Sequence, residues 1–160
     1  MISVIGIVLL CGSIIGFGLS YTSALRDERA CLEELISLCD MIHTRIECFK
    51  QPTGDIFRDF SSPYLDKCGF NGVLKSDGIR AATDSYCSSL PLPKRSLDAL
   101  RELSYKLGSG YAEEELRLCA RIRNEFRAEL AALNKAFPDR MKLSLTLSCA
   151  AAAMAAILFL

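Results

Sequence analysis

The chain opens with the apolar run MISVIGIVLLCGSIIGFGLSYTSAL (Met1–Leu25), which holds no Asp, Glu, Lys or Arg. A second uncharged run, LSLTLSCAAAAMAAILFL, occupies Leu143–Leu160. A helix needs roughly twenty apolar residues to cross the hydrocarbon core of a bilayer, which is about 30 Å thick. We therefore predict two transmembrane helices, 1–25 and 143–160, and a polar helical domain, 26–142, between them.

The charged residues predict how this arrangement is oriented. All 19 Lys and Arg and all 19 Asp and Glu fall within 26–142, and their balance without a basic block disfavours a nucleic-acid partner. Lys and Arg next to membrane spans stay on the cytoplasmic side. Basic residues stand on the inner flank of both runs, at Arg26, Arg29, Lys135, Arg140 and Lys142. We expect a two-pass integral membrane protein whose central domain is cytoplasmic.

A cleaved N-terminal signal is the alternative interpretation of the first run. Thr22-Ser23-Ala24 offers small residues near a possible cleavage point, and Leu9-Leu10-Cys11 resembles a lipoprotein processing site. However, no Lys or Arg precedes Arg26, whereas a signal peptide begins with a basic region. Leu10 is also larger than the residue that lipoprotein processing requires. The pattern favours a retained span.

Small residues recur every fourth position in both runs, and such stripes let two membrane helices approach closely. The predicted packing positions are Gly12, Gly16 and Ser20 in the first run and Ser144, Ser148, Ala152 and Ala156 in the second. The stripes could pack on each other or on neighbouring subunits, or both runs could serve only as lipid anchors.

Two long amphipathic helices are predicted next to the spans, at about 26–51 and 112–137. Their apolar residues follow the a/d spacing of a coiled-coil seam, interrupted once by Arg123. We expect Pro52 to end the first helix, Pro138 to break or kink the second, and the two helices to pair antiparallel. The seam residues are Leu32, Leu35, Cys39, Ile42, Ile46 and Phe49, facing Leu116, Cys119, Phe126, Leu130 and Leu133.

Shorter helices are expected between these two. Thr53 could cap a short helix with Ile56, Phe57 and Phe60 on one side, 64–77 reads as a loop with one helical turn, and 78–90 returns to helix. Ser96 could cap a further helix, which Gly108 ends. No alternating pattern suggests a strand, so the predicted fold class is all-α, a helical bundle built on the long antiparallel pair.

No arrangement of residues predicts catalysis, a cofactor or a metal. His43 is the only histidine, and Cys39-x-x-x-His43 would need two further ligands to hold zinc. The eight cysteines include no C-x-x-C pair, and a reducing cytosol would keep them as free thiols. We expect a non-enzymatic interaction protein without a small-molecule substrate; the alternatives are a thiol or metal sensor and a small holin-like membrane protein.

The order of these features resembles the stage III sporulation protein AB family of endospore-forming bacteria. The resemblance covers nearly the whole chain and rests on the glycine-punctuated first span, the long charged last helix and the apolar C-terminal tail. It also rests on the motifs Arg29-x-x-Leu32-Glu33-Glu34-Leu35, Met41-Ile42-x-Thr44-x-Ile46, Pro52, and Leu103-x-x-x-Leu107-Gly108-Ser109.

This resemblance implies a platform in the channel that joins mother cell and forespore. Its helical domain would be similar to the cytoplasmic domains of type II secretion system F proteins and would lie in the mother-cell cytoplasm, anchored in the outer forespore membrane. The implied partners are other stage III sporulation channel proteins, including a secretion-type cytoplasmic ATPase. No functional residue is carried over by the resemblance.

Overall fold

The computed structural model describes residues 2–49 and 56–159, and several side chains in the terminal segments lie outside this description. The described residues form no strand, which confirms the all-α fold class. The helices are α1 (Ile2–Phe49), α2 (Pro63–Lys67), α3 (Phe70–Tyr86), the 3₁₀ turn η1 (Cys87–Ser89), α4 (Lys94–Lys106) and α5 (Ala112–Phe159).

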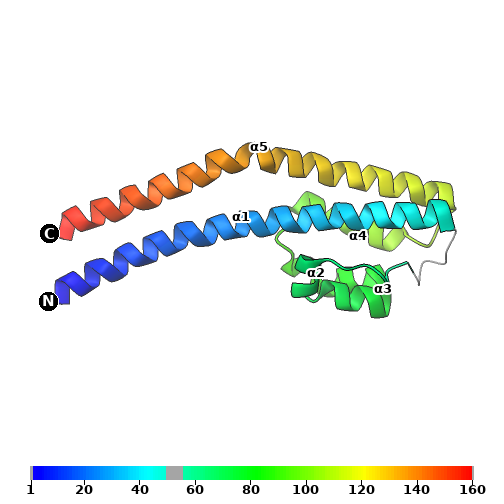
Figure 1. Cartoon of the computed structure of the whole chain (residues 1–160), viewed down its shortest axis with the longest axis horizontal. Helices are drawn as coiled ribbons and strands as arrows, with labels where there is room; N and C mark the ends of the chain where they lie inside the picture. Colours follow the sequence, from blue (N-terminus) through cyan, green and yellow to red (C-terminus); the bar gives the residue numbers. More distant parts are fainter. Residues whose placement is uncertain (1, 50–55, 160) are drawn as a thin grey trace. The chain divides into compact units, whose positions relative to one another are not determined.

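The chain divides into two compact units (Figure 1). Unit 1 contains Met1–Arg26 and Leu133–Leu160, and unit 2 contains Asp27–Ala132. The helices α1 and α5 are each 48 residues long, and each contributes to both units. Each uncharged run therefore lies on the same helix as one side of the polar body.

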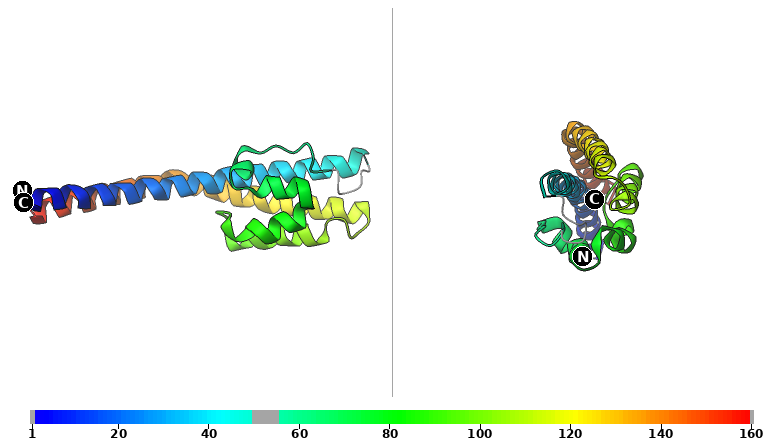
Figure 2. Two further views of the ribbon diagram at one scale, coloured as in Figure 1. Left: turned by 90° about the horizontal axis from the view of Figure 1, so that it is seen from below. Right: turned by 90° about the vertical axis from the view of Figure 1, so that its right-hand side faces the viewer.

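In unit 2, each helix contacts the next along the chain, and the last contacts the first. Glu34 joins α1 to α2, the α2–α3 and α3–α4 pairs pack together, and Glu102 of α4 pairs with Arg121 of α5 at 2.8 Å. Asp40 of α1 pairs with Arg123 of α5 at 2.7 Å, which closes the ring. Figure 2 shows the unit 2 parts of α1 and α5 side by side.

All five α-helices supply fully buried side chains to the core of unit 2. Burying one such Leu, Ile or Phe contributes about 1.5–3 kcal/mol, so shared burial is the main force that holds these short elements together. The largest fully buried side chains are Leu32, Leu35, Leu38, Ile42, Ile56, Leu65, Phe70, Leu74, Leu100, Leu103, Ile122 and Phe126.

A carboxylate of α1 holds the start of α2. The Glu34 side chain accepts hydrogen bonds from the backbone N–H groups of Tyr64 and Leu65, at 2.9 Å each, and from the Ser62 hydroxyl. Ser62 occupies the N-cap position of α2 without capping it by its own side chain. Because the first N–H groups of a helix have no partner within it, the distant Glu34 takes the place of a local cap.

The single helical turn expected within 64–77 is confirmed by α2 (Pro63–Lys67), whereas the loop expected for the rest of that segment is wrong, because α3 begins at Phe70. Phe70, Asn71 and Leu74 are buried, and this packing outweighs the turn-forming composition of the segment. The helical path breaks at Gly78, whose φ of 85° and ψ of 177° only glycine adopts readily. Residue 78 thus separates two helical stretches.

Three further expectations differ from the structure. Residues 56–59 form a turn, and Thr53 lies outside the described residues. The helix α4 starts at Lys94, because the Pro93 carbonyl accepts the first helical bond from the Leu97 N–H at 3.1 Å. Of the two effects expected of Pro138, the break is wrong: Pro138 lies inside α5, since a proline removes a single helical hydrogen bond and a long helix can continue beyond it. Gly108, at a φ of 83°, follows α4 as predicted.

Among the residues whose side chains are described, no helix is both long enough and apolar enough to cross a membrane. Most side chains of the first uncharged run, 1–25, are not among those that the structure describes.

Replacing Glu34 should loosen α2. We expect Glu34→Gln to lower the free energy of unfolding by about 1–3 kcal/mol, because charge-assisted bonds to three donors are weakened. Urea unfolding of the full chain in detergent measures this loss, and hydrogen exchange at Tyr64 and Leu65 localises it. The matched control is Glu33→Gln, which removes an exposed pair with Arg29 and should cost under about 1 kcal/mol. Equal losses in the two variants would contradict the role assigned to Glu34.

Two glycines of α3 should respond in opposite directions to alanine. Gly78→Ala should destabilise the chain by about 1–3 kcal/mol, because a Cβ strains the backbone at this φ although no atom lies within 4 Å of it. Gly72→Ala should stabilise by roughly 0.5–1 kcal/mol, because the site is helical and equally open. Thermal unfolding of both variants tests this, and a shift of the same sign in both would refute the backbone explanation.

Candidate functional site

Apart from Leu133, which belongs to unit 1, the seam positions lie on two helices that face each other in unit 2. On α1, Leu32, Leu35, Cys39, Ile42 and Ile46 are buried, and the Phe49 side chain lies outside the described residues. On α5, Cys119, Phe126 and Leu133 are buried, whereas Leu116 and Leu130 are half-buried. Burial is the main cause of the raised pKa of Cys39, and the Cys119 thiol across the seam adds to it.

Arg123, which interrupts the seam pattern, has a partner on the opposite helix. Its guanidinium donates to Asp40 at 2.7 Å, and Arg127 donates to the other oxygen of the same carboxylate at 3.3 Å. The Arg123 side chain is 24% exposed. A partly desolvated pair loses more than a surface pair when one member is removed. The contact between Arg123 and Asp40 therefore helps to set the register of α5 on α1.

The Cys39–His43 pair does not form a metal site in the described part of the chain. Cys39 is buried, and the His43 ring lies 3.4 Å from the Glu47 carboxylate on its own helix. Among the described residues, no group of three or more His, Cys, Asp or Glu side chains could hold a metal ion.

Most described cysteines are buried free thiols. Burial is the main cause that raises the pKa of Cys31, Cys39 and Cys87, and it raises that of Cys119 to about 11. A redox-sensing thiol needs an accessible, electropositive setting that lowers its pKa. Cys68 is half-buried and Cys149 is exposed, while the side chains of Cys11 and Cys48 lie outside the described residues. Burial thus argues against the thiol-sensor alternative for the four buried cysteines, Cys31, Cys39, Cys87 and Cys119.

The turn between α4 and α5 is built on a buried carboxylate. Glu115 accepts hydrogen bonds from the Gly108 N–H at 2.7 Å and the Gly110 N–H at 3.3 Å. The Ser109 hydroxyl donates to the Lys106 carbonyl at 2.7 Å. Glu115 lies in the first turn of α5, so its carboxylate ties the preceding turn to the start of that helix.

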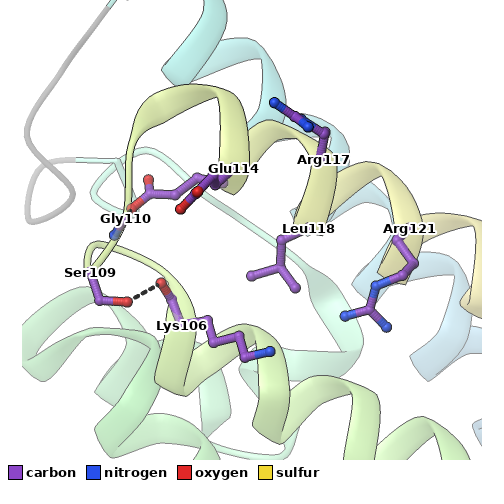
Figure 3. A pocket seen from close by; sticks show the side chains of 8 residues that line it. Lys106, Ser109, Gly110, Glu114, Arg117, Leu118 and Arg121 are labelled. Carbon is purple, nitrogen blue, oxygen red and sulfur yellow. Dashed lines mark hydrogen bonds between the residues drawn. The ribbon is translucent and has the colours of Figure 1, made fainter.

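An open cavity of about 490 Å³ lies between this turn and the facing sides of α4 and α5. In Figure 3, Leu118 points into the space toward Lys106, with Arg121 beside it, while Arg117 points away. The lining residues are Lys106, Ser109, Gly110, Glu114, Glu115, Arg117, Leu118 and Arg121.

Two cations that line the cavity, Lys106 and Arg121, pair with the same carboxylate of α4. The Glu102 carboxylate accepts from Arg121 and Lys106, at 2.8 and 2.7 Å, and both bonds hold its pKa below the usual range. The bond to Glu102 also raises the pKa of Arg121. Both groups therefore stay ionised near neutral pH and do not exchange protons readily. The cavity could accept an apolar group of a bound molecule against Leu118 and bind its polar groups through Lys106 and Arg121.

The small-residue stripes are only partly within the described set. Gly16 and Ser20 are exposed and Ser144 and Ser148 are half-buried, whereas Gly12, Ala152 and Ala156 lie outside the described side chains. A Cβ added at Gly16 would meet no described atom within 4 Å. This part of the first stripe is therefore not packed against the described chain.

Sequence reasoning missed the polar contacts that join the helices. Tyr105 of α4 donates to Asp84 at 3.0 Å, and Arg80 of α3 lies over its ring at 4.9 Å. These residues and Glu34 carry no periodic signal. Arg123 does interrupt the periodic pattern, and a charge at an apolar position of a seam indicates a partner on the opposite helix.

No protein-family model matches the chain, and no curated protein or solved structure matches it either.

The Glu102 bonds should make stability depend on pH. Because its pKa is lowered in the folded chain, its contribution is present above about pH 4.5 and is lost as the pH falls through the folded pKa. We expect Glu102→Gln to lower the thermal midpoint near pH 7 and to converge with the parent chain once the pH falls below the lowered pKa of Glu102. Thermal scans across this range test it, with Glu113→Gln, which removes a highly exposed pair, as the control. A pH-independent difference would rule out the linkage.

Proposed function

We propose that this chain is a non-enzymatic assembly platform anchored in a membrane by 1–25 and 143–160, with its helical body on the cytoplasmic side. The observation that carries the proposal is that each uncharged run shares one continuous 48-residue helix with the body. Two such helices tether one domain to a bilayer at both of its ends.

The exposed surface of α5 in unit 1 supports the second anchor. Leu143, Leu147 and Met154 are 60–61% exposed within a run that contains no charge. Their spacing of four and seven residues lies along one helical face. The Thr146 hydroxyl donates to the carbonyls of Lys142 and Leu143, at 2.9 and 3.1 Å, so its polar group is satisfied within the helix, as a lipid environment requires.

The body supports a binding role. Its charged groups that face neighbouring helices are used in structural pairs, such as Asp40 with Arg123 and Glu102 with Arg121. The cavity beside Leu118 is open, and its lining residue Arg121 remains ionised in its pair with Glu102. Such a surface suits contact with another protein.

The particular complex is proposed from the resemblance to the stage III sporulation protein AB family. On that basis the chain belongs to the channel between mother cell and forespore, sits in the outer forespore membrane, and contacts a secretion-type cytoplasmic ATPase and ring-forming channel proteins. The basic inner flanks of the two runs support the same orientation of the body.

Side-specific labelling tests the topology. Tyr111 is 83% exposed, so Tyr111→Cys, made together with Cys68→Ser, provides an accessible thiol on the body. We expect a membrane-impermeant maleimide to label this double variant only after the membrane is permeabilised. The chain with Cys68→Ser alone is the control and measures the background from the remaining thiols. Labelling of the double variant above that background in intact cells would place the body outside and overturn the proposal.

Affinity purification of the full chain from sporulating cells tests the platform role. We expect it to recover a cytoplasmic ATPase together with ring-forming membrane proteins. Recovery of the chain alone, from membranes in which the labelling pattern holds, would contradict the platform role and leave the two anchors standing.

A further inference from the structure

Charge is distributed unevenly between the two units. Unit 1 carries the basic residues Arg26, Lys135, Arg140 and Lys142 and one acid, Asp139, which gives a net charge of +3. The whole chain is neutral, so unit 2 carries −3. We call the four basic residues of unit 1 the basic collar. Such an asymmetry indicates that the collar and the body meet different electrostatic environments.

The described collar residues are open to solvent and have no described counter-ion. Arg26, Lys135 and Lys142 are exposed, and none of them forms an ion pair with a described carboxylate. The Arg140 side chain lies outside the described set. In unit 2, by contrast, Arg121 and Arg123 are each paired across helices. The collar cations therefore remain available to an external anion.

The collar directly borders the two uncharged runs. Arg26 follows the first run and Lys142 precedes the second. At about 1.5 Å of rise per helical residue, Lys135 lies about 12 Å from Leu143, where the second run begins. This reach is close to the Debye length of about 8–10 Å at physiological salt. Arg26 and Lys142 therefore lie within electrostatic range of a membrane surface at the ends of the runs, and Lys135 lies near its limit.

We propose that the basic collar binds the headgroups of anionic phospholipids in the leaflet that faces the body. The proposal rests on the membrane anchoring proposed above. Long Lys and Arg side chains can lay their apolar stems along a helix while the charged ends reach phosphate oxygens. The same anionic surface repels the body, with its net charge of −3, so the lipid contact is confined to the collar.

Spin-labelled lipids test the proposal on the full chain in phosphatidylcholine bilayers. The measured quantity is the association of labelled phosphatidylglycerol relative to labelled phosphatidylcholine. We expect a preference of about fivefold, the factor expected for one basic residue near an anionic surface. The preference should fall toward one at about 1 M salt, where the Debye length is about 3 Å.

A charge-matched pair of variants localises the effect. The triple variant Arg26→Gln, Lys135→Gln, Lys142→Gln should lose most of the preference. Its control, Lys67→Gln, Lys94→Gln, Arg95→Gln, removes the same charge from exposed positions of unit 2 and should retain it. No preference in the parent chain, or equal losses in both variants, would overturn the collar proposal.

Extraction separates this outcome from a failure of the anchoring. A chain that alkaline carbonate washes from the bilayers would refute the membrane anchors themselves. A chain that resists extraction and shows no headgroup preference would refute only the collar.

Discussion

The fold of unit 2 depends on the contact between α1 and α5, where Asp40 accepts hydrogen bonds from Arg123 and Arg127. Asp40 and Arg123 are 83 residues apart in the sequence, so their pairing must offset the entropy of closing a long loop. Buried Leu, Ile and Phe side chains supply the general attraction. The ion pair fixes the register of one helix on the other, because sliding either helix would leave a partly desolvated charge without its partner.

Two further carboxylates hold connections between helices of unit 2 in place. Glu34 accepts from backbone N–H groups at the start of α2, and Glu115 accepts from those of the turn before α5. Backbone groups in short connections need partners when they leave water. A carboxylate supplied from a long helix meets that need and at the same time ties the connection to the helix. Short elements such as α2 can thus be ordered without strong propensities of their own.

The proposed function follows from where the charges are used. In the body, charges such as those of Glu102 and Arg121 form pairs and stay ionised, which suits a binding surface better than acid–base chemistry. In the collar, the exposed cations border uncharged runs and lack described counter-ions. A platform held at a membrane needs both properties: a body shaped for protein contacts, and a boundary that recognises the lipid surface.

The all-α class and the end of α4 before Gly108 could be predicted from the chain alone, because the spacing of apolar residues and the preference of Gly108 for a left-handed backbone act locally. Many residues that follow the a/d spacing of the seam, such as Leu35 and Phe126, are buried. Tertiary structure decided the rest. Helix at 70–77 depends on burying Phe70 and Leu74, and the bonds of Glu34 and Asp40 join positions far apart in the chain. Such contacts leave no periodic trace, because a single polar side chain finds its partner only after the helices have packed.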